Sequence, residues 1–531
     1  MKNWKVTLLG FFIILALTLI LRLYNLDSLP IFADEAIYIR WAQVMRAEPT
    51  LRFLPLSDGK QPLFMWSIIP SFKLFSDPLV AGRVVSVVTG MGTLVGIFVL
   101  SVLLFAPKKL RLLKDLKLLR KETQTINIGL MAALFYAISS FSVFFDRMAL
   151  ADSMLAMLCL WFIIFYYLTV VTLRLDLAMI AGFFLGAAFI TKSPALFIAL
   201  IAPILWLFVD WKKERLKIQL VILSFLSLVT YFLSLAIYNI LRLGPNFHLL
   251  KSRTGDYVHP LSHVFSSPLD PFRSYIDRSF EYLLILGPWM LVVLGILGIL
   301  FTSKNYLRQK VLLLALFIIP ILVVSEFSKT MTARYIYFTL PYFYILAASA
   351  FLTSKRLVFN ISRLLMVTFV LIGGYRSLQL ISNPADAALP RSERSGYLEE
   401  WTAGTGIKEA SDIIREYNLQ NPNNKVVVGT EGYFGTLPDG LQVYLNDLPE
   451  VTVIGVGTDF TKIPSSLIES RDFGNKTYLL VNSSRFKHNE DEFDELGLII
   501  VEKWQKADRP EGIRERVQHG KYDLLYLLEL N

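Results

Sequence analysis

The sequence predicts a polytopic α-helical membrane protein with a soluble α/β domain at its C-terminal end, and three observations lead to this prediction. Of the 531 residues, 54% are hydrophobic, which is more apolar surface than a soluble domain of this length buries. Apolar runs long enough to cross a bilayer recur over residues 1–383. Residues 384–531 carry 16 Lys and Arg against 25 Asp and Glu, although the whole chain has a net charge of +10. We therefore expect a basic membrane domain over residues 1–383 and an acidic soluble domain over residues 384–531.

The membrane domain is expected to contain about eleven transmembrane helices. The first apolar run follows a basic start and lacks a small-residue cleavage site, so we interpret it as a retained helix. The single cysteine, Cys159, lies inside an apolar run, which excludes an intramolecular disulfide. The expected spans are residues 6–23, 79–105, 126–145, 149–172, 176–192, 194–209, 218–241, 282–302, 311–325, 335–352 and 364–381.

The distribution of Lys and Arg predicts how these helices are oriented. Residues 107–122 contain seven Lys and Arg, which indicates a cytoplasmic loop, and smaller basic turns at 210–217, 303–310 and 354–363 agree. Segment 62–75 is too short to span and holds Pro70 and Lys73, so we expect it to lie in the outer interface. Residues 24–78, 242–281, 326–334 and everything after 383 are then expected outside the cytoplasm.

The C-terminal segment has the pattern of a small α/β domain. Residues 406–418 have the 3.6-residue apolar spacing of a helix. The stretch GTEGYFG, residues 429–435, lacks the GxGxxG and Walker spacings, so we interpret its glycines as turn residues. We expect this domain to recognise an acceptor or to cover the membrane cavity, with residues 397–406 linking the two parts. Short β-branched apolar runs lie within residues 423–445, 450–457, 476–484 and 496–504.

Ionisable residues gather at the predicted outer edge of the membrane domain. Such groups cost a few kcal/mol each at membrane depth, so they usually line a cavity and pair with one another or with a ligand. Each also has a simpler interpretation: a solvated helix face for the acidic pair, snorkelling to headgroups for the cations, or a structural Arg147–Asp152 ion pair. Because five separate segments place charge at the same edge, we predict one shared pocket. Its members are Asp34, Glu35, Asp58, Lys60, Asp146, Arg147, Asp152, Lys192 and Arg334.

This mixture of charges suits the transfer of a sugar from a lipid phosphate. That reaction needs a carboxylate to take the proton of the acceptor hydroxyl and cations to hold the departing phosphate. A donor of this kind has its tail in the bilayer and its phosphate at the interface, where these residues are expected.

Five motifs, in order and placement, resemble the GT-C membrane glycosyltransferases, specifically the family 39-like branch with protein O-mannosyltransferases and the lipid A aminoarabinose transferase. They cover roughly residues 1–350 and are DEAIY (34–38), GKQPLFMW (59–66), DRMALADSML (146–155), TKSP (191–194) and ARYIYFTLP (333–341). The resemblance implies that Asp34 is the catalytic base, supported by Glu35 and Asp152, and that Tyr38 and Asp58 line the substrate cavity. It further implies donor-phosphate contacts from Lys60, Arg147, Lys192 and Arg334.

The sequence also departs from the family pattern. Ile37 and Tyr38 follow the acidic pair where the lipid A branch has Arg-Tyr, and Gly59 and Gln61 flank Lys60 where that branch has an acidic metal ligand. No cofactor is therefore assigned, and a divalent metal stays an open alternative. The loop histidines His248, His259 and His263 could supply ligands to such a metal or could be plain surface residues.

We therefore expect a multi-pass plasma-membrane glycosyltransferase that works on the outer face. It would move a hexose or pentose, such as mannose or aminoarabinose, from a polyprenyl-phosphate donor to a hydroxyl of a protein, lipid or envelope glycan, with inversion. Undecaprenyl or dolichyl phosphate would be the lipid product, and no nucleic-acid partner is expected. The alternatives are a lipid-linked glycan flippase, against which the absence of an evident internal repeat counts, and a non-catalytic envelope scaffold.

Overall fold

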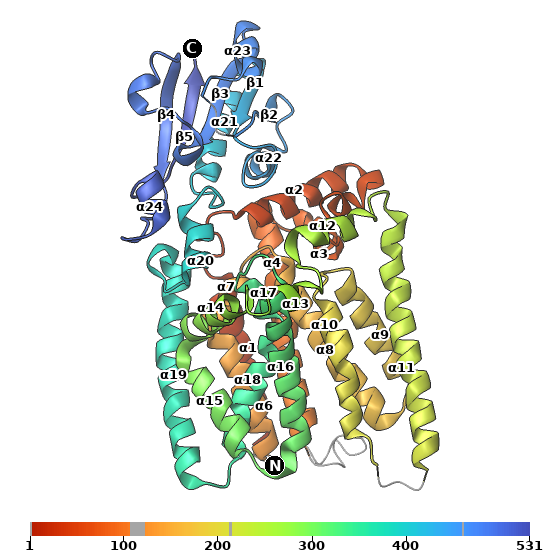
Figure 1. Cartoon of the computed structure of the whole chain (residues 1–531). Helices are drawn as coiled ribbons and strands as arrows, with labels where there is room; N and C mark the ends of the chain where they lie inside the picture. The colour runs from red at the N-terminus through yellow and green to blue at the C-terminus, as the bar shows by residue number, and fades with distance from the viewer. Residues whose placement is uncertain (1–2, 107–122, 212–214, 459–460) are drawn as a thin grey trace.

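The computed structural model describes residues 3–106, 123–211, 215–458 and 461–531, in which a helical bundle carries an α/β domain at one end (Figure 1). The N-terminal helix begins at the opposite end of the bundle, and the chain ends in the α/β domain. The basic loop 107–122 and part of the turn 210–217, on which the predicted orientation depends, lie outside the described residues.

The bundle is built from long apolar helices, as a multi-pass membrane protein requires. Two bent pairs add to these helices: α6 (Thr123–Ile138) with α7 (Ser140–Asp146), at 63°, and α14 (Phe272–Ile285) with α15 (Pro288–Phe301), at 106°. Six helices of the described residues are long and apolar enough to span: α1 (Asn3–Leu23), α4 (Pro78–Phe105), α8 (Ala151–Thr172), α11 (Leu216–Tyr238), α16 (Leu307–Phe327) and α19 (Arg356–Ser382).

Each expected apolar run coincides with a helical segment, but the count of eleven spans is not confirmed. Only six helices of the described chain meet the length and apolarity of a span, or up to eight if each bent pair counts as one. The remaining runs form helices shorter than a full span: α9 (Leu175–Phe189), α10 (Ala195–Ile201) continued by η5 (Ala202–Phe208), and α18 (Leu340–Ala348) continued by η8 (Ser349–Leu352).

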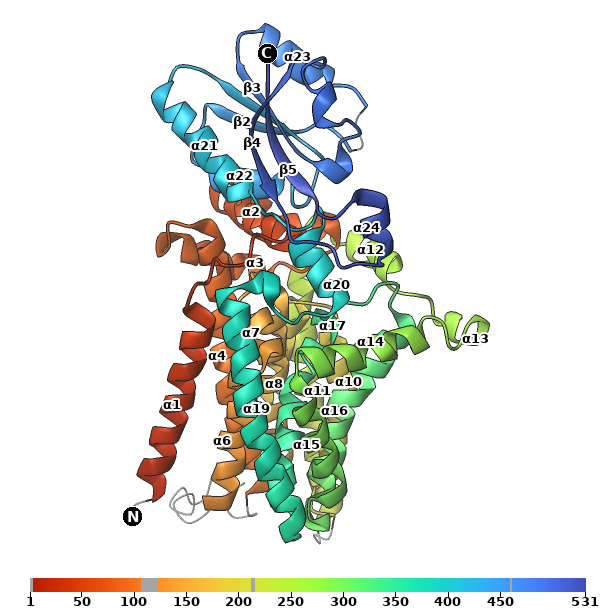
Figure 2. The same ribbon diagram turned by 90° about the vertical axis from the view of Figure 1, so that its left-hand side faces the viewer.

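Short helices cover the end of the bundle that faces the α/β domain, which we call the α2 end. The chain after the first spanning helix forms α2 (Ala33–Ala47), and residues 62–75 form two short segments instead of a span. Figure 2 shows α2 between the bundle and the α/β domain, with α13 projecting to one side. The other short elements are η1 (Pro49–Leu51), η2 (Leu54–Asp58), α3 (Leu63–Ile68), η3 (Ile69–Lys73), η6 (Asn239–Leu243), α12 (Leu249–Tyr257), α13 (His263–Ser266) and α17 (Arg334–Tyr337), while η7 (Lys304–Tyr306) lies between α15 and α16.

A buried carboxylate ties several helices together below the α2 end. Asp146, at the end of α7, accepts hydrogen bonds from Arg22 Nε at 2.7 Å, Tyr136 Oη at 2.6 Å, Tyr337 Oη at 2.6 Å and Ser153 Oγ at 2.7 Å. All five side chains are buried. An unpaired charge in this environment would be costly, so the network fixes α1, α6, α8 and α17 to the end of α7.

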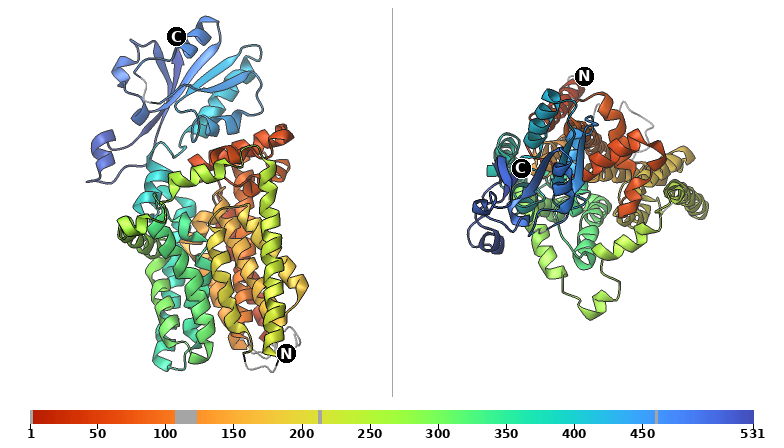
Figure 3. Two further views of the ribbon diagram at one scale, coloured as in Figure 1. Left: turned by 45° about the vertical axis from the view of Figure 1, so that its right-hand side comes forward. Right: turned by 90° about the horizontal axis from the view of Figure 1, so that it is seen from above.

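The C-terminal segment folds as a mixed five-stranded sheet flanked by helices. The strand order is β2-β1-β3-β5-β4, with β1 parallel to β2 and β3, and β5 antiparallel to β3 and β4. Seen from above, the domain leaves α11 uncovered (Figure 3). Its elements are η9 (Pro384–Asp386), α20 (Arg391–Arg394), η10 (Ser395–Glu399), α21 (Ile407–Gln420), β1 (Val426–Thr430), α22 (Asp439–Leu445), β2 (Val451–Gly455), α23 (Ser465–Asp472), β3 (Lys476–Asn482), η11 (Ser483–Arg485), η12 (Glu490–Glu492), β4 (Leu498–Gln505), α24 (Arg514–His519) and β5 (Leu524–Leu530).

The sequence predicted four of these strands and the helix α21. Two elements differ from expectation: residues 439–445 form the helix α22 instead of extended chain, and β5 was not expected. In α22, Leu441 and Leu445 are four residues apart and both buried, so they share one helix face; the same spacing also shares a face in a strand, which is why the sequence did not separate the two.

The sheet is oriented with the carboxyl ends of β1 and β3 toward the bundle. Strand β5 runs away from the bundle to the C-terminus, and β3 is antiparallel to it (Figure 1). The connector before α21 also contacts the chain that enters α2: Ala33 N–H donates to the carbonyl of Thr402 at 3.1 Å, and Gly404 N–H donates to the carbonyl of Ile31 at 2.8 Å. The domain is therefore attached next to the first turn of α2.

We predict that Asp146→Ala destabilises the whole bundle, because Arg22 would stay buried without its carboxylate. Loss of one partner of a buried ion pair costs about 3–5 kcal/mol. The thermal midpoint of the purified protein should therefore fall by several degrees. Asp176→Asn, which breaks a solvent-exposed pair with Arg174, is the matched control and should leave the midpoint nearly unchanged. Equal midpoints for the two variants would contradict this role of Asp146.

Candidate functional site

A cavity of about 290 Å³ opens at the α2 end of the bundle. It brings together most of the residues that the sequence singled out, from α2, the η2–α3 turn, the α9–α10 turn and α17. The ionisable and aromatic residues of its wall are Asp34, Tyr38, Asp58, Lys60, Lys192, Arg253, Tyr257, Arg334 and Tyr335.

The first turn of α2 sends its two neighbouring acids in different directions. Successive helical residues project about 100° apart, so Asp34 and Glu35 cannot share one environment. Glu35 Oε2 accepts the backbone N–H of Phe32 at 3.1 Å and so satisfies one of the free donors at the helix start. Asp34 faces the cavity instead.

Asp34 lies between two cations. Its Oδ1 is 3.0 Å from Lys60 Nζ, and its Oδ2 is 2.5 Å from Arg334 Nη1. Burial alone would raise the pKa of Asp34, but the charges of Arg334 and Lys60 outweigh burial and hold that pKa well below its usual range. Asp34 is thus an ionised carboxylate at neutral pH.

The other charged groups of the cavity are also paired. Lys60 Nζ lies 3.4 Å from Asp58 Oδ2 and 5.1 Å from the centre of the Tyr38 ring. Arg253 forms an ion pair with the same Asp58. Lys192 Nζ contacts Asp152 Oδ1 at 2.6 Å, so Asp152 joins the site through this lysine. Cations outnumber carboxylates in this cluster, which favours an anionic ligand such as a phosphate.

Glu35, a predicted support of Asp34, is not part of the cavity. Its Oε1 and Oε2 accept hydrogen bonds from Arg83 Nε at 2.9 Å and Arg83 Nη2 at 2.7 Å, and both side chains are fully buried. The backbone N–H of Ala149 donates a further bond to Oε1 at 2.6 Å. These contacts leave Glu35 no free face toward Asp34, so its role in this structure is to fix α2 against α4.

Arg147, a predicted phosphate ligand, also lies outside the cavity. Its guanidinium donates to the carbonyls of Arg22 at 3.0 Å, Tyr24 at 2.7 Å and Asn25 at 2.5 Å, where α1 ends. Helix ends leave carbonyl groups without partners, and a cation there satisfies them. The alternative Arg147–Asp152 pair does not form either, since Asp152 contacts Lys192.

Sequence reasoning missed three functional or supporting residues. Arg253 lies on the short polar helix α12, whose approach to Asp58 only the fold reveals. Tyr335 follows Arg334 directly, and its ring lies 5.6 Å from Lys192 Nζ. Arg83 had a usable signal, because a single charge inside an apolar run predicts a buried partner.

The described residues do not fit a divalent metal. Asp58 is committed to Lys60 and Arg253. His259 and His263 stack on each other with ring centres 4.0 Å apart, and neither lines the cavity. Within the described ranges no group of three or more His, Cys, Asp or Glu side chains could hold a metal ion. We therefore assign no step to a metal.

Apolar helices of spanning length, a carboxylate–cation cavity at the α2 end and a small α/β domain above it define the class of this protein: a multi-pass helical membrane protein with a C-terminal α/β domain. No protein-family model and no curated protein sequence matches the chain.

Among the solved structures that it resembles are two of ArnT from Cupriavidus metallidurans. The apo form superposes with a TM-score of 0.52 at 12% identity, and the form bound to undecaprenyl phosphate with 0.51 at 13% identity. Each comparison covers 99% of this chain and 98% of the ArnT chain. At this identity the likeness establishes the fold, and it confirms the resemblance drawn from the five motifs.

We predict that Glu35→Ala lowers stability more than Asp34→Ala does. Removing Glu35 leaves Arg83 fully buried without its carboxylate, which costs about 3–5 kcal/mol, whereas the pairs of Asp34 are partly solvated and their loss costs less. Thermal unfolding of the two variants should separate them by several degrees. A Glu35→Ala midpoint equal to that of wild type would show that Arg83 finds another partner.

Proposed function

We propose that this protein is a membrane glycosyltransferase that moves a sugar from a polyprenyl-phosphate donor to an acceptor hydroxyl at the α2 end. The observation that carries the proposal is Asp34, an ionised carboxylate held between Lys60 and Arg334 in a cavity at the end of an apolar bundle. The ArnT fold, one of whose structures holds undecaprenyl phosphate, supports a lipid-linked donor. We place the α2 end, with the C-terminal domain, outside the plasma membrane.

Lys60, Lys192, Arg253 and Arg334 would hold the donor phosphate. Fixed cations stabilise the charge that collects on a departing phosphate, because they need no reorganisation during the reaction. Arg334 presents a planar fork of donors that matches phosphate oxygens, and Lys60 and Lys192 act as point charges beside it.

Asp34 would act as the general base. The acceptor oxygen attacks the anomeric carbon while the bond from that carbon to the phosphate oxygen breaks. The bonding electron pair leaves with the phosphate, and the hydroxyl proton passes to Asp34. Attack opposite to the leaving group inverts the anomeric centre.

Donor binding would also activate this base. In the free protein Lys60 and Arg334 hold the pKa of Asp34 low, which makes it a weak proton acceptor. A phosphate that takes over these two cations removes the cause of the low pKa and brings a second negative charge close by, so the pKa of Asp34 rises. Asp34 would then accept a proton efficiently only when the donor is in place, which limits unproductive chemistry.

The first prediction of this proposal is that Asp34→Asn abolishes sugar transfer while the fold is retained. The measurement is label transfer from radiolabelled polyprenyl-phosphate sugars to an envelope acceptor fraction by the purified protein. A proton acceptor typically contributes 10²–10⁴-fold to the rate, so residual transfer should fall to about 1% or less. Asp176→Asn, which removes a solvent-exposed carboxylate outside the cavity, is the control and should transfer sugar like wild type. If Asp34→Asn instead moves lipid-linked sugar across vesicles as well as wild type, and neither consumes donor, the protein is a flippase.

The second prediction concerns pH. In wild type, the low pKa of Asp34 keeps the base ionised throughout pH 5–8, so kcat/KM should show no acidic limb from this group. Lys60→Met removes one of the two cations, so the pKa of Asp34 rises and the base is protonated at higher pH. The ratio of kcat/KM at pH 5 to that at pH 8 should therefore be lower in Lys60→Met than in wild type. An unchanged ratio would contradict the coupling between Lys60 and Asp34.

A further inference from the structure

An exposed aromatic cluster lies where the carboxyl ends of the parallel strands face the bundle. Tyr433 and Phe434, in the loop after β1, are 75% and 44% exposed, and Trp401 of the connector is 38% exposed. Such side chains at the surface of a domain usually mark a contact site. In open α/β sheets, ligands bind in the crevice outside the carboxyl ends of the parallel strands, which is the position of this cluster.

The loop that carries Tyr433 and Phe434 has a defined conformation. Gly432 and Gly435 adopt φ of +73° and +118°, so two of the three glycines of GTEGYFG serve the turn, as the sequence predicted, whereas Gly429 lies in β1. Gly435 N–H donates to the carboxylate of Asp439 at 2.7 Å, at the start of α22. This loop therefore presents its aromatic side chains on a fixed backbone.

The cluster is continuous with the cavity through one residue of α2. The ring of Trp41 lies 5.7 Å from the ring of Phe434 and 5.7 Å from Lys60 Nζ. Hydrogen bonds hold α2 to α22 beside this contact, from Arg40 Nε to Gln442 Oε1 at 3.1 Å. A ligand resting on the loop would thus lie one aromatic ring away from a cation of the cavity.

Polar groups without complete partners lie beside the rings. Asn482, at the end of β3, is 2% exposed and donates to Glu431 at 2.8 Å, but its Oδ1 has no hydrogen-bond partner in the described structure. The hydroxyl of Thr436, also 2% exposed, is unpaired within the described residues too. Unpaired buried polar atoms of this kind are usually satisfied by ordered water, so these two groups add polar character under the exposed rings.

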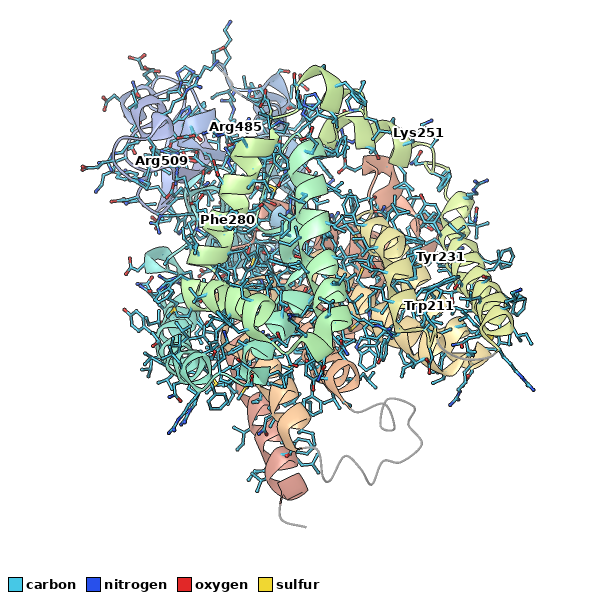
Figure 4. All side chains as sticks on the ribbon, turned by 60° about the horizontal axis from the view of Figure 1, so that its bottom comes forward. Trp211, Tyr231, Lys251, Phe280, Arg485 and Arg509 are labelled. Carbon is cyan, nitrogen blue, oxygen red and sulfur yellow. The ribbon has the colours of Figure 1, made fainter. Side chains whose placement is uncertain are left out.

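A buried acid and a stacked cation complete the surroundings. Burial raises the pKa of Glu431 to about 7, so near neutral pH this carboxyl group accepts or donates a hydrogen bond. The guanidinium of Arg485 lies 4.3 Å from the centre of the Trp401 ring, and its charge also acts on Glu431. Arg485 lies on the C-terminal domain, as does Arg509 (Figure 4).

We propose that this cluster is a carbohydrate-binding site that presents the acceptor's sugar to the cavity. The inference rests on the proposed glycosyltransferase function and names the chemical class of its acceptor. A sugar ring has an apolar C–H face, which would stack on Tyr433, Phe434 or Trp401, and a hydroxyl edge, which would bond to the partly exposed guanidinium of Arg485. Trp41 places such a sugar beside Asp34 and the donor phosphate.

Other ligands fit this chemistry less well. A free phosphate would meet Arg485 but also the carboxyl group of Glu431, on a domain with more acidic than basic residues. An acyl chain would meet an aromatic patch interrupted by polar groups and separated from the bundle core by α2. The alternation of rings and hydrogen-bonding groups favours a sugar.

The test is binding of methyl glycosides and disaccharides of mannose, glucose and N-acetylglucosamine to the full chain in nanodiscs, measured by saturation-transfer NMR. Nanodiscs are needed because glycosidic detergents would compete. For any sugar of this panel that binds wild type, Tyr433→Ser should weaken binding about tenfold, because one stacked ring is lost, and Tyr433→Phe should restore binding. Phe473→Ser is the matched control, since Phe473 is 85% exposed and lies just before the amino end of β3, at the other end of the strands from Tyr433.

Transfer kinetics provide a second readout. Trp401→Ala and Tyr433→Ser should raise KM for a glycan acceptor about tenfold and leave kcat and KM for the donor unchanged. If wild type transfers sugar while Tyr433→Ser binds and reacts like Phe473→Ser, the carbohydrate site is refuted and the transferase stands. If sugars bind in a Tyr433-dependent manner but no donor is consumed, the transferase is refuted and the binding site stands. If a peptide or lipid probe gives a saturation-transfer signal and none of the sugars does, the inference is overturned.

Discussion

The need to pair charges away from water organises the α2 end of this protein. Two fully buried ion pairs, Arg22–Asp146 and Arg83–Glu35, join segments that are distant in sequence. Neither pair touches the cavity, yet each is next to a residue that does. Glu35 follows Asp34 by one helical step, and Tyr337, a partner of Asp146, lies one turn beyond Arg334. The cavity therefore derives its geometry from ion pairs beneath it.

Exposure separates the charged pairs by what they can do. A pair with no solvent contact cannot exchange partners, because breaking it leaves an unpaired charge in a medium of low polarity. The cavity pairs differ, since Lys60 and Asp34 are 22% and 17% exposed and Arg334 is 15% exposed. Water or an incoming anion reaches these groups at little cost. The same residue types therefore form fixed structural pairs beneath the cavity and pairs that can change partners inside it.

The sequence predicted the fold class and the gathering of charge but not the direction of each side chain. Apolar runs and basic turns are patterns of many residues, so one unusual residue changes them little. The bundle and its polar end could therefore be predicted from them. Glu35 and Arg147 illustrate this limit. Glu35 lies on a different face of α2 from Asp34, and Arg147 contacts the end of α1 instead of the cavity. Only the packing of the helices decides these contacts. Strand β5 and helix α22 were missed for a similar reason: their apolar residues form short runs that suit either state until the sheet and α2 are in place.

Helix α2 joins the two halves of the molecule at the place where the chemistry is proposed. One stretch of it carries Asp34 and Tyr38 toward the cavity, and Trp41, one turn further, meets the loop of the α/β domain. A lipid-linked donor would approach from the bundle and a water-borne acceptor from the side of the C-terminal domain, so the two substrates would meet at this helix. A carboxylate on any spanning helix would sit too deep for the acceptor, and one on the α/β domain would sit too far from the donor phosphate. The first turn of an interfacial helix satisfies both requirements, which gives a physical reason for the position of Asp34 on the short helix that follows the first apolar helix.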